Sequence, residues 1–251
     1  MDLKLNQKTA LITGASQGIG RAIAKALAVE GVQTCITARR KNLLETLSAE
    51  IVAAGGKKPE IILFDVMQAE APAQMAAAAT KALGHVDILI NSAGGSKGTI
   101  TVETPNEAWE ESMILNFDRV RQLTHALLPG MIERQWGRII NISGKSEPDA
   151  LIAATPTKAA IHAWSKGLSR SIGPHGITIN CIPPGRIMSE QILRKYSPEF
   201  RAHQSATEIP VGRYGEPEEL AALAVFLASP VAAYITGTVM PVDGGLRRYA
   251  F

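Results

Sequence analysis

Short apolar runs alternate with segments of helical periodicity along the whole chain, and this alternation constrains the fold more than any other feature. Apolar runs predict seven strands, at about 9–13, 33–37, 60–64, 88–91, 137–142, 178–182 and 238–241. Predicted helices lie between them, near 19–30, 43–54, 72–83, 109–134, 156–172 and 217–227. Strands that alternate with helices are typical of βαβ units, whose right-handed crossovers place helices on both faces of a parallel sheet. The sequence therefore predicts an α/β fold with a seven-stranded, mostly parallel, doubly wound sheet.

The composition is that of one globular domain. The chain has 251 residues, a length that a single wound α/β domain fills, and no repeat, linker or change of composition divides it. Apolar residues make up 46% and charged residues 20%, which excludes disorder as the main state. The net charge is only +3 and the longest basic run is Arg39–Lys41, so a nucleic-acid partner has little support. We predict one domain over residues 1–251.

Several other classes of protein are disfavoured by the absence of their signals. No apolar run approaches the roughly 20 residues that cross a bilayer, and the N-terminus does not have the pattern of a signal peptide. Two cysteines, Cys35 and Cys181, are too few for a disulfide scaffold and are expected to be buried thiols in a reducing compartment. The five histidines show no metal-ligand spacing and are interpreted as packing or surface residues. We expect a cytoplasmic protein without a membrane partner or a metal.

A glycine-rich turn follows the first predicted strand and leads directly into an amphipathic helix. Glycine permits a tight turn, close approach of the backbone to a pyrophosphate and close packing of helix on strand, while the helix N-terminus presents free N–H groups to the anion. The alternative is a glycine-rich turn that only reverses the chain. The strand-turn-helix context favours a dinucleotide site, with the candidate residues Gly14, Ser16, Gln17, Gly18, Ile19 and Gly20.

Arg39 and Arg40 follow the second predicted strand, where a cofactor with a free ribose 2′-hydroxyl would favour an acidic residue. Two guanidinium groups suit a 2′-phosphate, which they can bind through charge-assisted hydrogen bonds. The alternative is that both arginines only begin a solvated helix face. We predict NADP rather than NAD as the cofactor.

The motifs in their order along the chain resemble the short-chain dehydrogenase/reductase family, and the resemblance covers essentially the whole length. The chain looks most like its 3-oxoacyl-[acyl-carrier-protein] reductases. The motifs that carry the resemblance are Thr13–Gly20, Asp65-Val66, Asn91-Ser92-Ala93-Gly94, Asn116, Ser143, Lys158, Pro184-Gly185-Arg186-Ile187 and Tyr234-Ile235-Thr236-Gly237 with Val242-Asp243-Gly244-Gly245.

The resemblance implies a single-domain Rossmann fold that binds NADP and transfers a hydride between the cofactor and a ketone or secondary alcohol. It implies a homotetramer, or next a dimer, built on the helices near 109–134 and 156–172 and on the last strand. Further cofactor residues implied by it are Asp65 and Val66 at the adenine, Asn91, Ala93 and Gly94 along the cleft, and Pro184, Gly185 and Ile187 at the nicotinamide. The implied catalytic residues are Ser143 for the substrate oxygen, Lys158 for the nicotinamide ribose and Asn116 for a backbone-linked water.

The chain departs from the family at the general acid. Members of the family carry a tyrosine four residues before the lysine, and here that position is Ala154. Thr155 and Pro156 have the pattern of a helix N-cap and first helical residue, so the lysine helix is predicted to start at Pro156 and to leave Ala154 outside its first turn. The sequence therefore predicts an atypical active site.

Other side chains are candidates for the missing proton donor. Lys158 could polarise the substrate oxygen directly or through a water, and Tyr196 could reach in from the segment after the sixth strand. The cluster of Lys145, Glu147 and Asp149 could supply Lys145 or Glu147, or could form only local ion pairs on a solvated loop.

Residues 186–213 are the candidate substrate lid. They carry five cationic and three acidic side chains, a mild bias toward an anionic substrate or carrier, although a short charged surface helix would look the same. The sequence thus favours an NADP(H)-dependent oxidoreductase. Two alternatives stay open: a catalytically silent nucleotide-binding or regulatory protein, and a lyase or isomerase that uses the same pocket.

Overall fold

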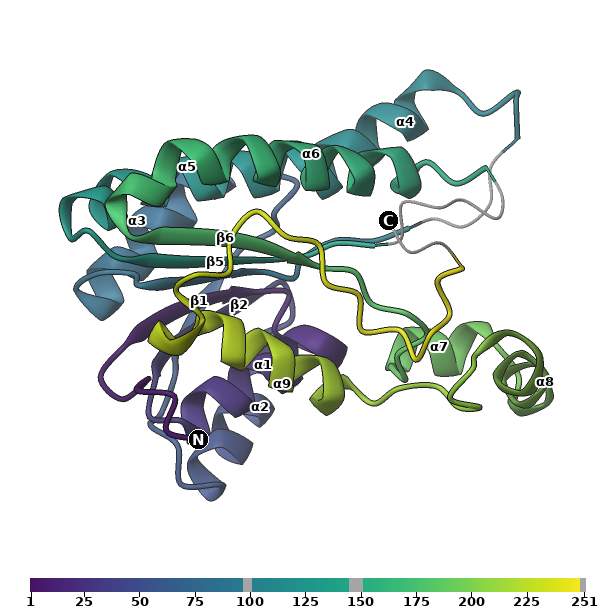
Figure 1. The fold of residues 1–251 in the computed structure, drawn as a ribbon, viewed down its shortest axis with the longest axis horizontal. Coiled ribbons are helices and arrows are strands. Elements are labelled where there is room, and N and C mark those ends of the chain that lie inside the picture. The colour runs from purple at the N-terminus through teal and green to yellow at the C-terminus, as the bar shows by residue number, and fades with distance from the viewer. Residues whose placement is uncertain (97–100, 145–150, 249–251) are drawn as a thin grey trace.

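Six parallel strands form a central sheet in the order β3-β2-β1-β4-β5-β6 (Figure 1). The computed structural model describes residues 1–96, 101–144 and 151–248, and the statements that follow concern these ranges. The strands are β1 (Thr9–Thr13), β2 (Gln33–Ala38), β3 (Glu60–Leu63), β4 (Ile88–Asn91), β5 (Gly137–Ile142) and β6 (Ile177–Ile182). The predicted doubly wound α/β architecture is confirmed.

Helices cover both faces of the sheet, because alternate residues of each buried strand point to opposite faces. In β1, Ile12 packs into the core on one side and Leu11 into the core on the other. The first face carries α1 (Gly18–Val29), α2 (Lys41–Ala53) and α9 (Pro217–Ala228), and the second carries α3 (Ala71–Leu83), α5 (Arg119–Glu133) and α6 (Ala154–Ile172) (Figure 1).

The remaining helical segments lie at the ends of these layers. The predicted helix near 109–134 is built from α4 (Asn106–Met113), a π-helical turn η1 (Ile114–Asp118) and α5 in direct succession. The predicted lid region folds into two short helices, α7 (Glu190–Lys195) and α8 (Pro198–Glu208), which extend beyond the sheet (Figure 1). Two short 3-10 turns are η2 (Gly173–His175) and η3 (Pro230–Ala232).

The prediction of a seventh strand at 238–241 is wrong in its detail. That segment runs parallel to β6 in isolated bridges, with backbone hydrogen bonds from Cys181 N to Thr238 O and from Met240 N to Cys181 O, both at 2.9 Å. Pro183 has no N–H to donate at the next position of the ladder, so the pairing does not continue as a regular strand.

The predicted start of the lysine helix is also wrong. Helix α6 begins at Ala154 rather than at Pro156, and Ala153 is its N-cap. Pro156 is accommodated as the third helical residue, because the first four N–H groups of a helix have no partner within the helix and none is lost there. Ala154 therefore lies in the first turn of α6, on the helix that carries Lys158.

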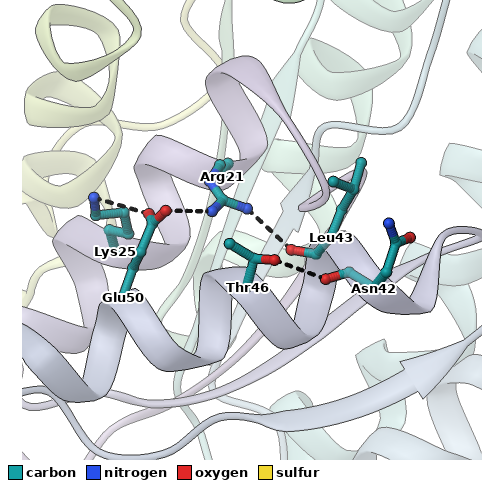
Figure 2. Close-up of polar contacts among 6 residues, drawn as sticks. All are labelled: Arg21, Lys25, Asn42, Leu43, Thr46 and Glu50. Carbon is teal, nitrogen blue, oxygen red and sulfur yellow. Dashed lines mark hydrogen bonds and ion pairs between the residues drawn. The ribbon is translucent and has the colours of Figure 1, made fainter.

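An ion-pair cluster ties α1 to α2 beside the glycine turn. Arg21 donates from Nη2 to Glu50 Oε1 at 2.7 Å and from Nη1 to the Leu43 carbonyl at 3.0 Å, and Lys25 Nζ lies 3.2 Å from Glu50 Oε2 (Figure 2). The hydrogen bond from Arg21 holds the pKa of Glu50 below its usual value.

Replacing Glu50 by glutamine is expected to lower the free energy of unfolding by less than about 1 kcal/mol, since the pair is half-exposed and screened by solvent. Because the pKa of Glu50 is lowered in the folded state, its contribution is present at neutral pH and is lost as the pH falls through that folded value. Urea unfolding at pH 7 and at pH 3 measures the difference. Glu45→Gln is the matched control, since Glu45 lies 3.5 Å from exposed Lys41 on the same helix. Equal losses in both variants at both pH values would contradict a specific role for Glu50.

Both cysteines are buried and unpaired, as the sequence predicted. Within the described ranges, no helix has the length and apolar character needed to span a membrane.

Candidate active site

The site lies where the order of the strands reverses, at the carboxyl ends of β1 and β4. Gly14 has φ +66°, and a Cβ built on it would lie 2.9 Å from Ser92 O and Ala93 N. The Thr13 hydroxyl oxygen accepts hydrogen bonds from the N–H groups of Ser92 and Ala93, each at 3.0 Å. The first turn is therefore pressed against the segment that follows β4, and only glycine fits at position 14.

The glycine turn leads directly into α1, whose N-terminus faces the cleft. Gly18, the first residue of α1, has φ +55°, and a Cβ on Gly20 would lie 2.6 Å from the Gly14 carbonyl oxygen. No side chain caps the N-terminus of this helix. Its first N–H groups are thus available to an anion, as the sequence predicted.

Arg40 is anchored to the glycine turn. Its Nη2 donates to Gln17 Oε1 at 2.6 Å and to Ser16 Oγ at 3.2 Å. Arg39 is more exposed, and its Nη1 lies 3.8 Å from Asp65 Oδ2. Of the two predicted phosphate ligands, Arg40 is held at the turn while Arg39 reaches toward the end of β3.

These residues border a cleft of about 550 Å³, a typical size for a small-molecule site. The cleft is lined by most of the residues that the sequence predicted: Gly14, Ser16, Gln17, Gly18, Ile19, Gly20, Arg39, Arg40, Asp65, Val66, Ala93, Gly94, Asn116 and Ile187.

Lys158 and Asn116 meet at the backbone of Gly94. A Cβ on Gly94 would lie 3.0 Å from both Lys158 Nζ and Asn116 Oδ1. Asn116 is fixed in the π-helical turn η1 by hydrogen bonds with both backbone groups of Gly95 and with Ser112. The ammonium group of Lys158 donates to the Ile142 carbonyl at 3.3 Å. The structure thus brings two of the three predicted catalytic residues together at Gly94: Asn116 lines the cleft, and Lys158 lies behind the lining residue Gly94.

Burial lowers the pKa of Lys158 to about 8. Desolvation disfavours the charged form of the side chain. A lysine with this pKa exchanges its proton near neutral pH, which suits a general acid.

Ser143 faces α6, the helix that also carries Lys158. Its Oγ is buried at the end of β5 and lies 2.8 Å from Nε2 of the half-buried His162. Burial and the charges of Arg247 and Lys158 lower the pKa of His162 to about 4. His162 was interpreted from the sequence as a packing or surface residue. Its position four residues after Lys158 places it one helical turn further along the same face, and this spacing was the sequence signal that could have placed His162 near the site.

Ala154 lines the cleft where the family resemblance implies a tyrosine. It is flanked there by Ala153 and Ile142, which also line the cleft. Ala154 and Lys158 lie one helical turn apart, so both are on the same face of α6. The wall of the cleft at this point is apolar.

Four of the residues predicted to hold the cofactor do not line the cleft in the described part of the chain: Asn91, Lys158, Pro184 and Gly185. The Asn91 amide instead donates to Asn141 Oδ1 and Thr124 Oγ1 in the core. Gly185 packs against Asp243, whose Cα would lie 2.5 Å from a Cβ on the glycine, and Pro184 bridges Val242. Ser189, which the sequence analysis missed, lines the cleft beside Gly18.

The other candidates for the proton donor do not gain support. Tyr196 ends α7, where its ring stacks on Phe200 with centroids 4.9 Å apart, and it is not among the described residues that line the cleft. Lys145, Glu147 and Asp149 lie outside the described residues.

A family model described as "Enoyl-(Acyl carrier protein) reductase" matches residues 14–247. The 3-oxoacyl-[acyl-carrier-protein] reductase FabG of Escherichia coli is 35% identical over 242 residues, covering 95% of this chain and 97% of the relative. The chain belongs to the short-chain dehydrogenase/reductase family. It is thus a member of a family of oxidoreductases.

Solved structures of the same family superpose over nearly the whole chain. The short-chain type dehydrogenase/reductase from Mycobacterium marinum has a TM-score of 0.90 at 31% identity and covers 98% of each chain. A 3-oxoacyl (acyl-carrier-protein) reductase from Agrobacterium tumefaciens C58, with NADP bound, has a TM-score of 0.90 at 29% identity, covering 96% of this chain and 95% of the other. The fold is therefore that of the family.

Proposed function

We propose that the protein is an NADP(H)-dependent oxidoreductase that reduces a ketone or oxidises a secondary alcohol, with an atypical proton donor. The observation that carries this proposal is one cleft with two different ends. The glycine turn and Arg40 form one end, and Gly94 with Asn116 forms the other, with the ammonium of Lys158 directly behind Gly94. A 3-oxoacyl-like substrate is the first candidate, since reductases of that class are among the relatives.

The residues at the first end fit NADP. Gly14 and Gly20 line the cleft, and their neighbours leave no room for a Cβ, so both present bare backbone there. The N-terminus of α1 is uncapped. Arg40 adds a cation at the position after β2 where NAD-specific sites favour an acidic residue. The Agrobacterium tumefaciens relative binds NADP. When bound, the cofactor supplies the hydride.

Lys158 then holds the proton that the substrate oxygen requires. Its ammonium lies against Gly94, which lines the cleft, and has a pKa of about 8, so it delivers a proton near neutral pH directly or through a water. Ser143, bound to His162, supports the end of β5 beside this group. This assignment replaces the family's tyrosine with the lysine itself.

The test is a measurement of cofactor binding followed by a panel of carbonyl and alcohol substrates. NADPH is expected to bind with a lower Kd than NADH, and at least one ketone is expected to be reduced with consumption of NADPH. Tight NADPH binding with no turnover of any ketone or alcohol would count against the oxidoreductase.

The pH profile of ketone reduction tests the role of Lys158. Because the pKa of Lys158 is lowered to about 8, its ammonium is present below that pH and is lost above it. kcat/KM is expected to be level between pH 6 and 7.5 and to fall about tenfold per unit well above pH 8, since this ratio reports groups of the free enzyme. Lys158→Arg keeps the charge but does not release its proton in this range, so its profile should lack the fall. The same fall in both proteins would assign it to another group.

A catalytically silent nucleotide-binding protein is the second candidate function, and the apolar wall at Ala154 favours it. Such a protein binds NADPH with the same preference but shows no turnover. Restored turnover in the Ala154→Tyr variant, with none in the natural chain, would identify this case.

The proposed assembly is a homotetramer of single-domain subunits, built on α4, α5 and α6. Ala163 is exposed on α6, and Trp164 is half-buried against His125 of α5 with ring centroids 6.0 Å apart. Light scattering of the purified protein tests it, and a monomer mass at micromolar concentration would contradict it.

A further inference from the structure

Arg186 lies at the junction of the cleft and the two lid helices. Its segment pairs in parallel with the segment after α8: the Arg186 carbonyl accepts from Gly215 N at 2.9 Å, and Met188 N donates to Gly215 O at 2.7 Å. Neighbouring side chains of an extended segment point to opposite sides. Ile187 packs into the core and lines the cleft, so Arg186 points away from the core, toward α7 and α8.

The surroundings of the Arg186 guanidinium are aromatic and cationic. Its Cζ lies 5.8 Å from the centroid of the Tyr196 ring, which stacks in turn on Phe200. The Tyr214 side chain is buried nearby, and the charges of Arg186 and Arg201 both act to lower its pKa against the larger opposing effect of burial. Two guanidinium groups thus lie close enough to act on the Tyr214 hydroxyl, together with the carboxylate of Glu208, which acts in the opposite direction.

No acidic side chain neutralises this arginine. Among the described residues its guanidinium forms no hydrogen bond or ion pair, and its Nε is buried without a partner. Of the nearby carboxylates, Glu219 is paired with Arg213, and Glu208 accepts a hydrogen bond from the neutral Gln204 amide without an ion pair to Arg186 in the described ranges. A buried guanidinium nitrogen without an acceptor costs free energy, and an incoming anion removes that cost with charge-assisted hydrogen bonds.

We infer that Arg186 binds an anionic group of the substrate, a carboxylate or a phosphate, while the carbonyl of the same molecule enters the cleft past Ile187. This inference rests on the proposed function and specifies its substrate class as small ketones that carry an anion. The planar guanidinium can bind either anion through two parallel hydrogen bonds. Tyr196 and Phe200 then form an apolar cover over the anion.

Binding of matched probe pairs to the NADP⁺-saturated protein tests the inference without turnover, because oxidised cofactor cannot reduce a ketone. The carboxylate pair is 4-oxopentanoate with its methyl ester, and the phosphate pair is dihydroxyacetone phosphate with dihydroxyacetone. Isothermal titration is expected to give a Kd at least about tenfold lower for the anion than for the neutral partner in one of the pairs, and that pair identifies the anion. Equal Kd values within both pairs would overturn the inference.

Arg186→Gln is expected to abolish this preference, and Arg186→Lys to retain only part of it, because an ammonium lacks the two-pronged geometry. Arg194→Gln is the matched control, since it removes the same charge from the exposed surface of α7 and should leave the preference unchanged. Thermal unfolding and the Kd for NADP⁺ verify that each variant is folded. A preference that survives in folded Arg186→Gln would overturn the inference.

Failure of the inference is distinguishable from failure of the proposed function. Reduction of neutral ketones by NADPH without any preference for anions supports the oxidoreductase and overturns the role of Arg186. Anion-selective binding that depends on Arg186, without turnover of any probe, supports the site and counts against the oxidoreductase.

Discussion

Replacing Ala154 by tyrosine is expected to raise kcat for ketone reduction by about 10²- to 10⁴-fold, the usual contribution of a positioned general acid. Ala154 is the first residue of α6, lines the cleft and lies one helical turn before Lys158. A phenol at this position therefore projects into the cleft on the face of the helix that carries the buried ammonium, whose charge lowers the pKa of the phenol. NADPH consumption with the best ketone of the panel measures the gain.

Ala154→Phe is the matched control for this variant, because it adds the same ring without the hydroxyl. It is expected to give no gain, or a loss if the ring obstructs the cleft. A gain in the phenylalanine variant equal to that of the tyrosine variant would contradict a proton-donating role. Lys158→Met in the Ala154→Tyr background should remove most of the gain, since the phenol then loses the neighbouring charge.

The activity of the natural chain, measured beside that of the Ala154→Tyr variant, distinguishes two states of the natural site. If Lys158 already delivers the proton, the natural chain has a measurable rate whose pH profile falls above about pH 8, and the tyrosine changes both the rate and the profile. If the site is silent, activity appears only with the tyrosine. In both cases the remaining geometry of the cleft is sufficient for hydride transfer.

Local sequence signals were enough to predict the elements that build the cofactor end of the cleft. β1, β4 and β5 have the predicted bounds, and α1 begins one residue before its predicted start. These elements depend on apolar runs and on a glycine turn, which act over a few residues of sequence. The sequence indicated Gly14 and Gly20 because such a turn requires residues without a Cβ. In the structure Gly14 has a positive φ, and Gly20 lies too close to the Gly14 carbonyl for a side chain.

The sequence signals failed where two local rules compete. Thr155-Pro156 is a strong N-cap and first-residue pair, yet α6 starts two residues earlier, because proline is tolerated anywhere in the first turn. Similarly, the apolar run at 238–241 predicts a strand, and it does form hydrogen bonds with β6, but Pro183 lacks the N–H that would make the pairing continuous.

Side-chain orientation at the ends of strands was the other limit. The assignment of Ser143 to the substrate oxygen stays a prediction, but the contact of its hydroxyl with His162 on α6 was not indicated by the sequence. Asn91 was assigned to the cleft, whereas its amide lies in the core against Asn141. Both contacts join residues far apart in the sequence, so no local pattern reports them. They follow from the register of β5 against its neighbours and from the face that α6 presents.

Replacing Arg40 by glutamine is expected to raise the Kd for NADPH by about tenfold to a hundredfold and to leave the Kd for NADH almost unchanged. The structure holds Arg40 against the glycine turn through Ser16 and Gln17, at the end of β2 where the 2′-phosphate of the cofactor would lie. Hydrogen bonds to a charged group contribute about 1.5–3 kcal/mol each, and about 1.4 kcal/mol is a factor of ten in affinity. Fluorescence titration of both cofactors measures the effect.

NADH separates the two roles that Arg40 has in this structure. If Arg40 mainly holds the turn in place through Gln17, its loss weakens both cofactors equally, because both contain the pyrophosphate that the turn binds. If it binds the 2′-phosphate, only NADPH is affected. Arg39→Gln is the matched control, and its side chain, 75% exposed and 3.8 Å from Asp65, predicts a smaller change. An equal loss of NADPH affinity in both variants would mean that the two arginines act as a general positive potential rather than through the specific site at Arg40.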